Sequence, residues 1–145
     1  MPARRLAAAL LLAPSLALVG PALGAGAGDL GSGRAAPAAR SRDVGPAELA
    51  RLLGTGNVVL VNVHVPYDGE IERTDVFVPF NAIEAHLGRL PERRDTRLVV
   101  YCRSGAMGAI AAKTLVRLGY TNVRNLDGGM VGWERAGYPL ARGPR

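Results

Sequence analysis

The sequence predicts an α/β domain with a small, mostly parallel central sheet and helices on both faces. Residues 58–65 (VVLVNVHV) and 98–101 (LVVY) are mostly apolar and rich in β-branched side chains, which is typical of strands buried on both faces. The segments between predicted strands carry helical apolar spacing or helix-end residues. Strands that alternate with helices along one chain predict a parallel sheet with helical crossovers.

The N-terminal half of this domain is predicted to contain two helices. The first covers residues 46–53, because proline suits the first turn of a helix and Gly54 suits its end. The second runs from Asn81 to about residue 90, since Asn81 and Glu84 have the spacing of an N-cap residue and its capping partner.

The C-terminal half is predicted to contain a long helix, a strand over residues 122–126 and a short last helix after Gly128-Gly129. The long helix is inferred from apolar residues that share one face at helical spacing: Met107, Ile110, Ala111, Leu115 and Leu118. Trp133 and Tyr138 are expected to pack the end of the domain rather than to bind a ligand.

Length and composition predict one globular domain, over residues 43–142. The chain has 145 residues, of which 48% are hydrophobic and only 5% aromatic, so Val, Leu and Ala are expected to fill the core. The net charge is +6, but the basic residues are scattered and are not interleaved with aromatic residues. We therefore expect no nucleic-acid partner and only a mild attraction for small anions.

Residues 1–24 are predicted to be a secretory signal peptide. Arg4 and Arg5 give it a positive start, an apolar stretch follows, and small residues near Ala25 offer a cleavage site. The apolar stretch is short for a membrane span, although an uncleaved anchor is the alternative. Residues 25–42, rich in Gly, Ala, Ser and Arg, predict a flexible linker. We expect an exported protein, periplasmic or secreted, with no stable membrane span after processing.

Cys102 is the main candidate for a reactive group and is the only cysteine of the chain. It directly follows the predicted strand 98–101, and a short loop then leads into the long helix. In an open α/β sheet, ligands bind beyond the carboxyl ends of the strands, which is where this sulfur is expected to lie. The alternative is a small buried core residue, as free cysteines frequently are.

The loop after Cys102 is predicted to stabilise negative charge on the sulfur. Backbone N–H groups of the loop and the N-terminus of the long helix are expected to point at it, and such an arrangement favours a thiolate. Gly105 permits a tight backbone path, and Arg103 adds positive charge at the rim. A nucleophile in an anion-stabilising loop can form a covalent intermediate, so no metal or other cofactor is implied.

Three segments of the chain resemble the rhodanese family. VVYCRSGAMG at residues 99–108 resembles the active-site loop of that family, with its nucleophilic cysteine. NLDGGMVGWERAGYPL at residues 125–140 is similar to the closing signature of Gly-Gly, Trp, Ala-Gly and Pro, and VLVNVHVPYDGEI at residues 59–71 takes the place of the first strand motif. Together the segments cover almost the whole predicted domain.

The resemblance implies a rhodanese-like fold and a sulfurtransferase or sulfane-sulfur carrier, with Cys102 as the persulfide-forming nucleophile. The substrate-binding amides correspond to the next five residues: Arg103, Ser104, Gly105, Ala106 and Met107. The implied reaction takes sulfur from a small sulfur-containing anion such as thiosulfate and gives it to a thiol, to cyanide or to a partner protein. A catalytically weak sulfur-binding or protein-interaction module is the alternative.

The chain departs from the family pattern near the predicted site. Asn62 and His64 stand where the family usually has Asp and Arg, and Met107 stands where it often has a polar residue. The segment after the first strand also adds negative charge through Glu70, Glu72 and Asp75. Because an anionic donor favours cations near the nucleophile, these differences predict weak turnover of thiosulfate.

Two other classes of site fit the sequence less well. Cys-based phosphatases and arsenate reductases need an arginine six positions after the cysteine to grip an oxyanion, and Gly108 holds that position. A metal site would use residues that are close in sequence: His64, Asp68, Glu70, Asp75 and, further on, His86. Their spacing matches no metal-ligand pattern. His64 is instead expected to be hydrogen-bonded and partly buried, and His86 to lie on the surface.

Overall fold

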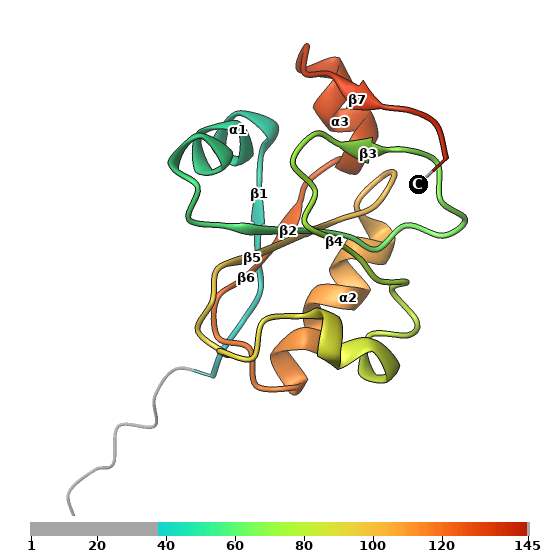
Figure 1. The fold of residues 1–145 in the computed structure, drawn as a ribbon. Helices are drawn as coiled ribbons and strands as arrows, with labels where there is room; N and C mark the ends of the chain where they lie inside the picture. Colours follow the sequence, from blue (N-terminus) through green and yellow to red (C-terminus); the bar gives the residue numbers. More distant parts are fainter. Residues whose placement is uncertain (1–37, 145) are drawn as a thin grey trace, which may run out of the picture. The chain divides into compact units, whose positions relative to one another are not determined.

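A parallel sheet forms the centre of the domain. The computed structural model describes residues 38–144, so the predicted signal peptide and most of the predicted linker lie outside the described residues. Every neighbouring pair in the five-stranded sheet is parallel, as the sequence predicts (Figure 1). In spatial order the strands are β1 (Arg42–Val44), β6 (Val123–Leu126), β5 (Leu98–Tyr101), β2 (Val59–Asn62) and β4 (Val76–Phe77). A separate antiparallel pair is formed by β3 (Glu70–Ile71) and β7 (Leu140–Ala141).

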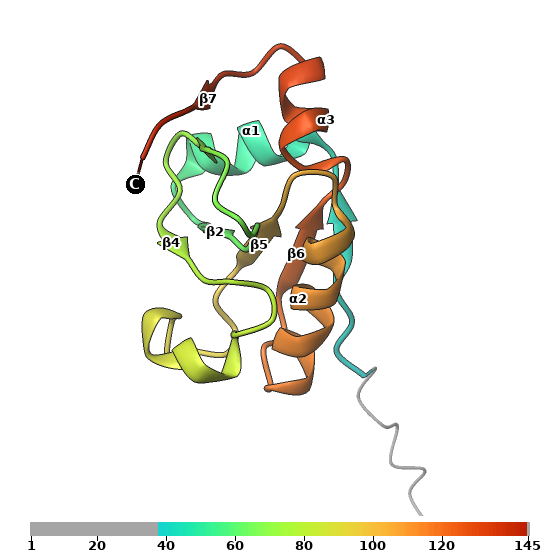
Figure 2. The ribbon, with the colours of Figure 1, turned by 90° about the vertical axis from the view of Figure 1, so that its right-hand side faces the viewer.

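Helices cover both faces of the sheet, which also agrees with the prediction. One face packs against α1 (Pro46–Thr55) and α3 (Gly129–Arg135). The other face packs against α2 (Ala106–Arg117) and the 3-10 helix η1 (Glu84–Arg89) (Figure 2). Side chains alternate between the two faces, so Val99 belongs to the core under α1 and Val100 to the core under α2.

The central strand β5 positions the candidate site. All four of its residues are buried, because β2 and β6 flank it and helices cover both of its faces. A strand in that position has no polar face, which explains its uninterrupted apolar sequence. Parallel strands end at the same edge of a sheet, so this edge receives the residues that directly follow β2, β5 and β6: Val63, Cys102 and Asp127.

Two predicted boundaries in the first half are wrong. Helix α1 continues through Gly54 to Thr55, and Gly56 ends it in the left-handed conformation, at φ 71°, with its N–H bonded to the carbonyl of Leu53. The predicted strand 58–65 ends at Asn62. The reason is local, since the side-chain Oδ1 of Asn62 accepts the backbone N–H of His64, which a neighbouring strand would otherwise bind.

Two predictions about helices are also wrong. The segment after Asn81 forms the 3-10 helix η1, with no side-chain cap and with a non-helical backbone at His86, so the capping box does not form. In α2 the buried residues are Gly108, Ala111, Ala112 and Leu115. Ile110 lies beside that stripe and is 52% exposed, because one residue of offset turns a helical side chain by about 100°.

Tyr101, the last residue of β5, ties the segment after β2 to the sheet. Its buried hydroxyl accepts the backbone N–H of Ile71 at 3.0 Å and shares a hydrogen bond of 2.7 Å with Thr74 Oγ1. Burial is the main reason that the pKa of Tyr101 is raised to about 12. The hydroxyl therefore stays protonated and serves as a structural hydrogen-bonding group.

Tyr101→Phe is expected to lower the free energy of unfolding by about 1–3 kcal/mol, because it leaves the buried N–H of Ile71 without its acceptor. Tyr120→Phe is the control, since its hydroxyl only donates to the carbonyl of Pro91 and an unpaired carbonyl is less costly. Urea denaturation measures both. An equal or smaller loss for Tyr101→Phe would show that this hydroxyl does not anchor the segment.

Candidate active site

Cys102 lies at the carboxyl end of the central strand, at the base of an exposed loop. It follows β5 directly, and three loop residues separate it from α2. Cys102 itself is only 1% exposed, whereas Arg103 and Ser104 are exposed. The sulfur is therefore placed as the sequence predicts relative to the sheet, but the loop and the core under α2 enclose it almost completely.

One backbone N–H contacts the sulfur directly. Gly105 donates its N–H to Cys102 Sγ at 3.0 Å, and a φ of 103° at Gly105 turns this group toward the sulfur. The first bond of the α2 ladder runs from Ala109 N–H to Gly105 O. The N–H groups of the first helical turn, Ala106 and Met107 among them, therefore precede the ladder at the positive end of a twelve-residue helix.

The other predicted loop residues differ in how exposed they are. Arg103, Ser104 and Ala106 are exposed at the surface. Met107 is partly buried and packs against the apolar cluster that contains Cys102. Of the N–H groups in the loop as described, that of Gly105 is the one that hydrogen-bonds Sγ. The predicted set of N–H groups that face the sulfur is therefore represented by one hydrogen bond and by the adjoining N-terminus of α2.

The Gly-Gly turn before α3 holds the loop from the other side. Met130 N–H donates to Cys102 O at 2.8 Å, and Val131 N–H donates to Arg103 O at 3.0 Å. A Cβ on Gly129 would lie 2.6 Å from Arg103 C and 2.7 Å from Arg103 O, at a residue whose φ is 55°. The sequence predicts a turn at this position but not the contact with the cysteine loop, which only the fold reveals.

Gly108 stands six positions after the cysteine, and its packing leaves no room for an arginine there. It is buried in α2 and faces β6, where an added Cβ would overlap the side-chain oxygen of Asn125. Asn125 in turn donates to Asp43 Oδ1 of β1 at 3.0 Å. A long cationic side chain does not fit this position, so the loop lacks the bidentate oxyanion grip of Cys-based phosphatases.

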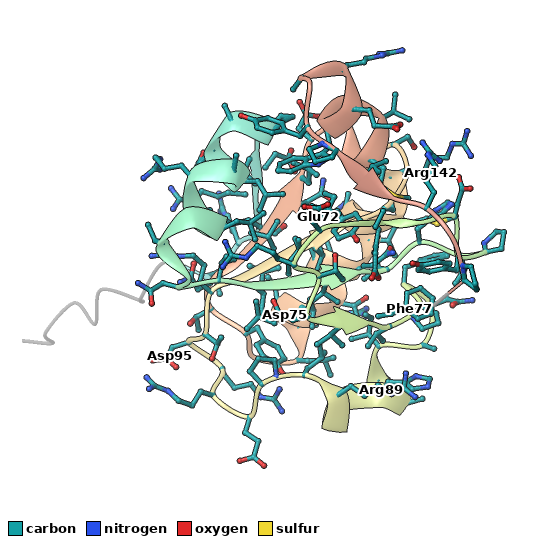
Figure 3. The ribbon with its side chains drawn as sticks, turned by 45° about the horizontal axis from the view of Figure 1, so that its top comes forward. Glu72, Asp75, Phe77, Arg89, Asp95 and Arg142 are labelled. Carbon is teal, nitrogen blue, oxygen red and sulfur yellow. The ribbon has the colours of Figure 1, made fainter. Side chains whose placement is uncertain are left out.

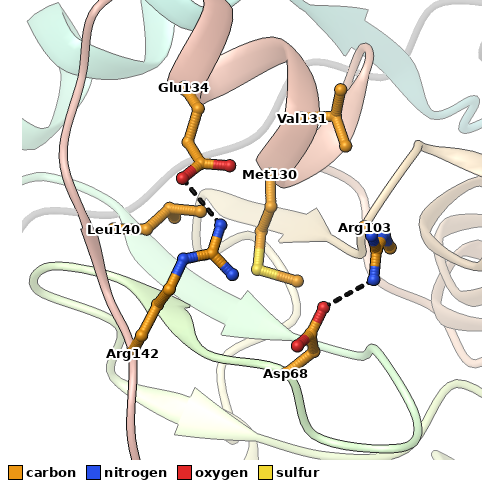
Figure 4. Close-up of a pocket in the computed structure, with 7 residues that line it drawn as sticks. All are labelled: Asp68, Arg103, Met130, Val131, Glu134, Leu140 and Arg142. Atoms are coloured by element: carbon orange, nitrogen blue, oxygen red, sulfur yellow. Dashed lines mark hydrogen bonds and ion pairs between the residues drawn. The ribbon is translucent and has the colours of Figure 1, made fainter.

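A small hollow adjoins the loop, and its charged side chains form two ion pairs (Figure 4). Arg103 Nη1 donates to Asp68 Oδ2 at 2.7 Å, and Arg142 Nη2 donates to Glu134 Oε1 at 2.7 Å. The residues that line the hollow are Asp68, Arg103, Met130, Val131, Glu134, Leu140 and Arg142. No sequence pattern predicts the first pair, because Asp68 and Arg103 are 35 positions apart along the chain.

Asn62 and His64 shape the segment that brings Asp68 to the site. Asn62 is fully buried and donates to Gly69 O at 3.0 Å, which closes the turn around Asp68. His64 is only 8% exposed, and its Nδ1 has no hydrogen-bond partner among the described residues. His64 is thus more deeply buried than the sequence predicts, and the hydrogen bond that it makes comes from its backbone N–H, which donates to Asn62 Oδ1. Burial is the main cause of its lowered pKa; Asp68 raises this pKa, and Arg103 lowers it.

The buried imidazole makes stability depend on pH in a defined direction. Because the pKa of His64 is lower in the folded protein than its ordinary value of 6.5, the unfolded chain takes up a proton first as the pH falls. The wild type is therefore expected to lose more unfolding free energy between about pH 7 and pH 5 than His64→Gln does. Urea denaturation at both pH values measures this difference, and identical losses in the two proteins would contradict it.

Three of the residues considered for a metal, Asp68, Asp75 and His86, have side-chain partners in the structure. Asp68 pairs with Arg103, and Asp75 Oδ2 accepts the N–H of Leu60 at 2.8 Å. His86 is half-buried, and its Nδ1 lies 2.8 Å from Ala82 O. Across residues 38–144, no three His, Cys, Asp or Glu side chains gather closely enough to hold a metal ion. In the same range no helix is long and apolar enough to span a membrane.

The aromatic residues near the C-terminus pack as predicted. The rings of Trp133 and Tyr138 stack with their centroids 4.3 Å apart. Trp133 is buried, and its indole N–H donates to Pro139 O at 2.9 Å. These contacts fix the end of α3, whose first turn holds the cysteine loop.

The fold and the cysteine loop define a rhodanese-like domain, and comparisons with known proteins agree. The family model for the Rhodanese-like domain matches residues 45–136. The chain belongs to this family.

Individual proteins resemble the chain in sequence or in fold. A protein of Allochromatium vinosum named "Sulfurtransferase" is 37% identical over 93 residues, which are 62% of this chain and 84% of that protein. A rhodanese-related protein of Thermoplasma volcanium has the same fold, with a TM-score of 0.59 and 24% identity over 69% of this chain and 97% of that one. A Rhodopseudomonas palustris protein described as a possible tyrosine phosphatase has a TM-score of 0.59 and 26% identity, over 69% of this chain and 84% of that one.

Proposed function

We propose that this rhodanese-like protein is a sulfurtransferase that carries sulfane sulfur as a persulfide on Cys102. The observation that carries the proposal is the position of Sγ at the end of β5, bonded to Gly105 N–H and close to the N-terminus of α2. Peptide dipoles in this arrangement stabilise an anionic sulfur, both as the attacking thiolate and as the persulfide that follows. The sulfurtransferase relative supports the same chemistry.

The proposed reaction has two balanced halves. In the first, the Cys102 thiolate attacks the outer sulfur of a donor such as thiosulfate; a bond forms between the two sulfur atoms, the S–S bond of the donor breaks, and sulfite leaves with the electron pair. In the second, a thiol or cyanide attacks the outer sulfur of the persulfide, and the electron pair of the broken bond returns to Sγ. No oxidant, metal or cofactor enters either half.

The burial of the sulfur bears on the kind of donor. Cys102 is 1% exposed, so Sγ offers a small target to an incoming molecule. A donor that presents one terminal sulfur suits such a target better than a bulky group does. A phosphatase activity is not supported, since Gly108 leaves the loop without its arginine and no other cation replaces it between residues 104 and 108.

A weak sulfur carrier that passes sulfur to a partner protein is the second candidate. The ion pair between Arg103 and Asp68 favours it, because the one cation of the cysteine loop is already paired with a carboxylate. Fast turnover with thiosulfate and cyanide would point to the enzyme. Stable sulfur loading with slow turnover would point to the carrier.

Intact mass spectrometry after incubation with thiosulfate tests the persulfide directly. The mature protein is expected to gain the mass of one sulfur atom, and Cys102→Ser is expected to gain none. Because the chain has one cysteine, the site of any added sulfane sulfur is unambiguous. A wild-type protein that gains no sulfur from thiosulfate or from a low-molecular-weight persulfide would overturn the proposal.

We also propose that the protein is exported, with residues 1–24 removed as a signal peptide. The positive start, short apolar stretch and small residues of this segment support the proposal. Cell fractionation and N-terminal sequencing test it. Full-length protein recovered from the cytoplasm would contradict it.

A further inference from the structure

We propose that Asp68 is a specificity-determining residue, which neutralises Arg103 and so reduces the preference of the site for doubly charged sulfur donors. The inference rests on the proposed sulfur transfer at Cys102 and adds the class of donor: a singly charged or neutral sulfane-sulfur compound rather than a small dianion. It concerns the relative rates of donors, not whether the cysteine reacts.

The ion pair involves the one charged side chain of the cysteine loop. Within the sequence CRSGAM, residues 102–107, only Arg103 carries charge. Its Nη1 donates to Asp68 Oδ2 at 2.7 Å, and the two side chains are 62% and 43% exposed. Such an exposed pair adds little to stability, but it places a carboxylate beside the cation that an anionic donor would otherwise meet.

The fold holds the carboxylate there. Asp68 lies in the turn that Asn62 closes through its bond to Gly69 O, and Asn62 is fully buried. The loop that carries Arg103 is held by the first turn of α3, where Val131 N–H donates to Arg103 O. Both partners therefore stand on anchored backbone, which keeps the two exposed side chains within reach of each other.

Among the described residues that line the hollow, no unpaired cation remains beside this pair. The other basic group that lines the hollow, Arg142, is paired with Glu134 at 2.7 Å (Figure 4). His64, the titratable group next to Asp68 and Arg103, is buried and has a lowered pKa, so it is neutral at pH 7. The charged side chains that line the hollow thus sum to zero, two cations against two anions.

Donor charge can be varied while the chemistry stays the same. Thiosulfate, a dianion, gives its outer sulfur to the thiolate and leaves as sulfite. Methanethiosulfonate, a monoanion, gives its outer sulfur in the same way and leaves as methanesulfinate. In both cases one S–S bond forms at Cys102 Sγ, one breaks, and the leaving group takes the electron pair. A change in the ratio of the two rates between wild type and variant therefore reports the electrostatics of the site, because the intrinsic reactivities of the donors cancel.

The test compares kcat/KM of the wild type and Asp68→Asn for both donors, with cyanide as the acceptor and at low ionic strength. One charge about 6 Å away in a water-like dielectric changes a rate about threefold, so thiosulfate is expected to gain about tenfold and methanethiosulfonate about threefold. Both gains should shrink as salt is added, because the charges are exposed.

Asp95→Asn is the matched control. Asp95 also forms an exposed pair with an arginine at 2.7 Å, with Arg93, but it precedes β5 and lies at the opposite end of the strand from Cys102. Figure 3 shows Asp95 and Arg142 on opposite sides of the domain. The variant removes the same charge from the protein as a whole, and it is expected to leave the ratio of the two donors unchanged.

The outcomes separate this inference from the proposed function. A larger gain for thiosulfate in Asp68→Asn, absent in Asp95→Asn, supports the inference. If the wild type acquires sulfur at Cys102 but Asp68→Asn changes both donors equally or neither, the inference is wrong and the sulfur transfer stands. If the wild type acquires no sulfur by mass spectrometry, the proposed function fails and this inference fails with it.

Discussion

Cys102→Ser is expected to lower the rate of sulfur transfer by a factor of about a thousand or more, because a hydroxyl cannot form the persulfide intermediate. The same change is expected to cost only about 1–2 kcal/mol of stability, since the serine oxygen can still accept the N–H of Gly105 while it meets apolar neighbours. Thiocyanate formation from thiosulfate and cyanide measures the first effect, and urea denaturation measures the second.

The two effects together distinguish a reactive cysteine from a core residue. A buried packing cysteine would show a loss of stability and no activity to lose. The prediction requires a folded variant with almost no transfer. A Cys102→Ser protein that transfers sulfur at the wild-type rate would show that the reaction does not use this thiol.

Gly129→Ala is expected to lower the free energy of unfolding by about 2–4 kcal/mol and to reduce sulfur loading severely. The added Cβ would lie 2.6 Å from Arg103 C, a backbone atom that cannot move aside as a flexible side chain can. The residue also has a φ of 55°, which side-chain-bearing residues rarely adopt. The cysteine loop has to shift to make room, and the bond between Gly105 N–H and Sγ shifts with it.

Gly54→Ala is the matched control for that experiment. Gly54 lies inside α1 with no atom within 4 Å of an added Cβ, so alanine is expected to stabilise the protein by about 0.5–1 kcal/mol. Urea denaturation and mass spectrometry of the persulfide are run on both variants. If Gly129→Ala is as stable and loads as much sulfur as Gly54→Ala, the turn before α3 does not hold the loop.

The sheet and its helices were predictable because they depend on patterns within short segments. The central strand β5 is apolar throughout, and α2 has a stripe of small and apolar residues, so both appear in the sequence. Strands β3, β4 and β7 have two residues each and β1 has three, which is too short for any alternation to show. Helix η1 was predicted as an α-helix because sequence spacing alone does not reveal the non-helical backbone at His86.

Only the part of the candidate site that is contiguous in sequence was predictable. Cys102 and the next five residues are contiguous, so the position after β5 and the start of α2 located them. The contacts from Gly129 and Asp68 come from segments distant along the chain, and the fold alone brings them to the loop. The depth at which His64 is buried is not predictable for a related reason, since it depends on the turn that Asn62 closes.

A single-turnover chase tests most directly whether Cys102 carries sulfur from donor to acceptor. The protein is treated with thiosulfate, freed of excess donor and then mixed with cyanide, while thiocyanate and the intact mass are followed together. We predict one thiocyanate for each protein molecule that had gained a sulfur atom, and return of the protein to its original mass. Thiocyanate formed without that loss of mass, or added sulfur that cyanide cannot remove, would contradict the account.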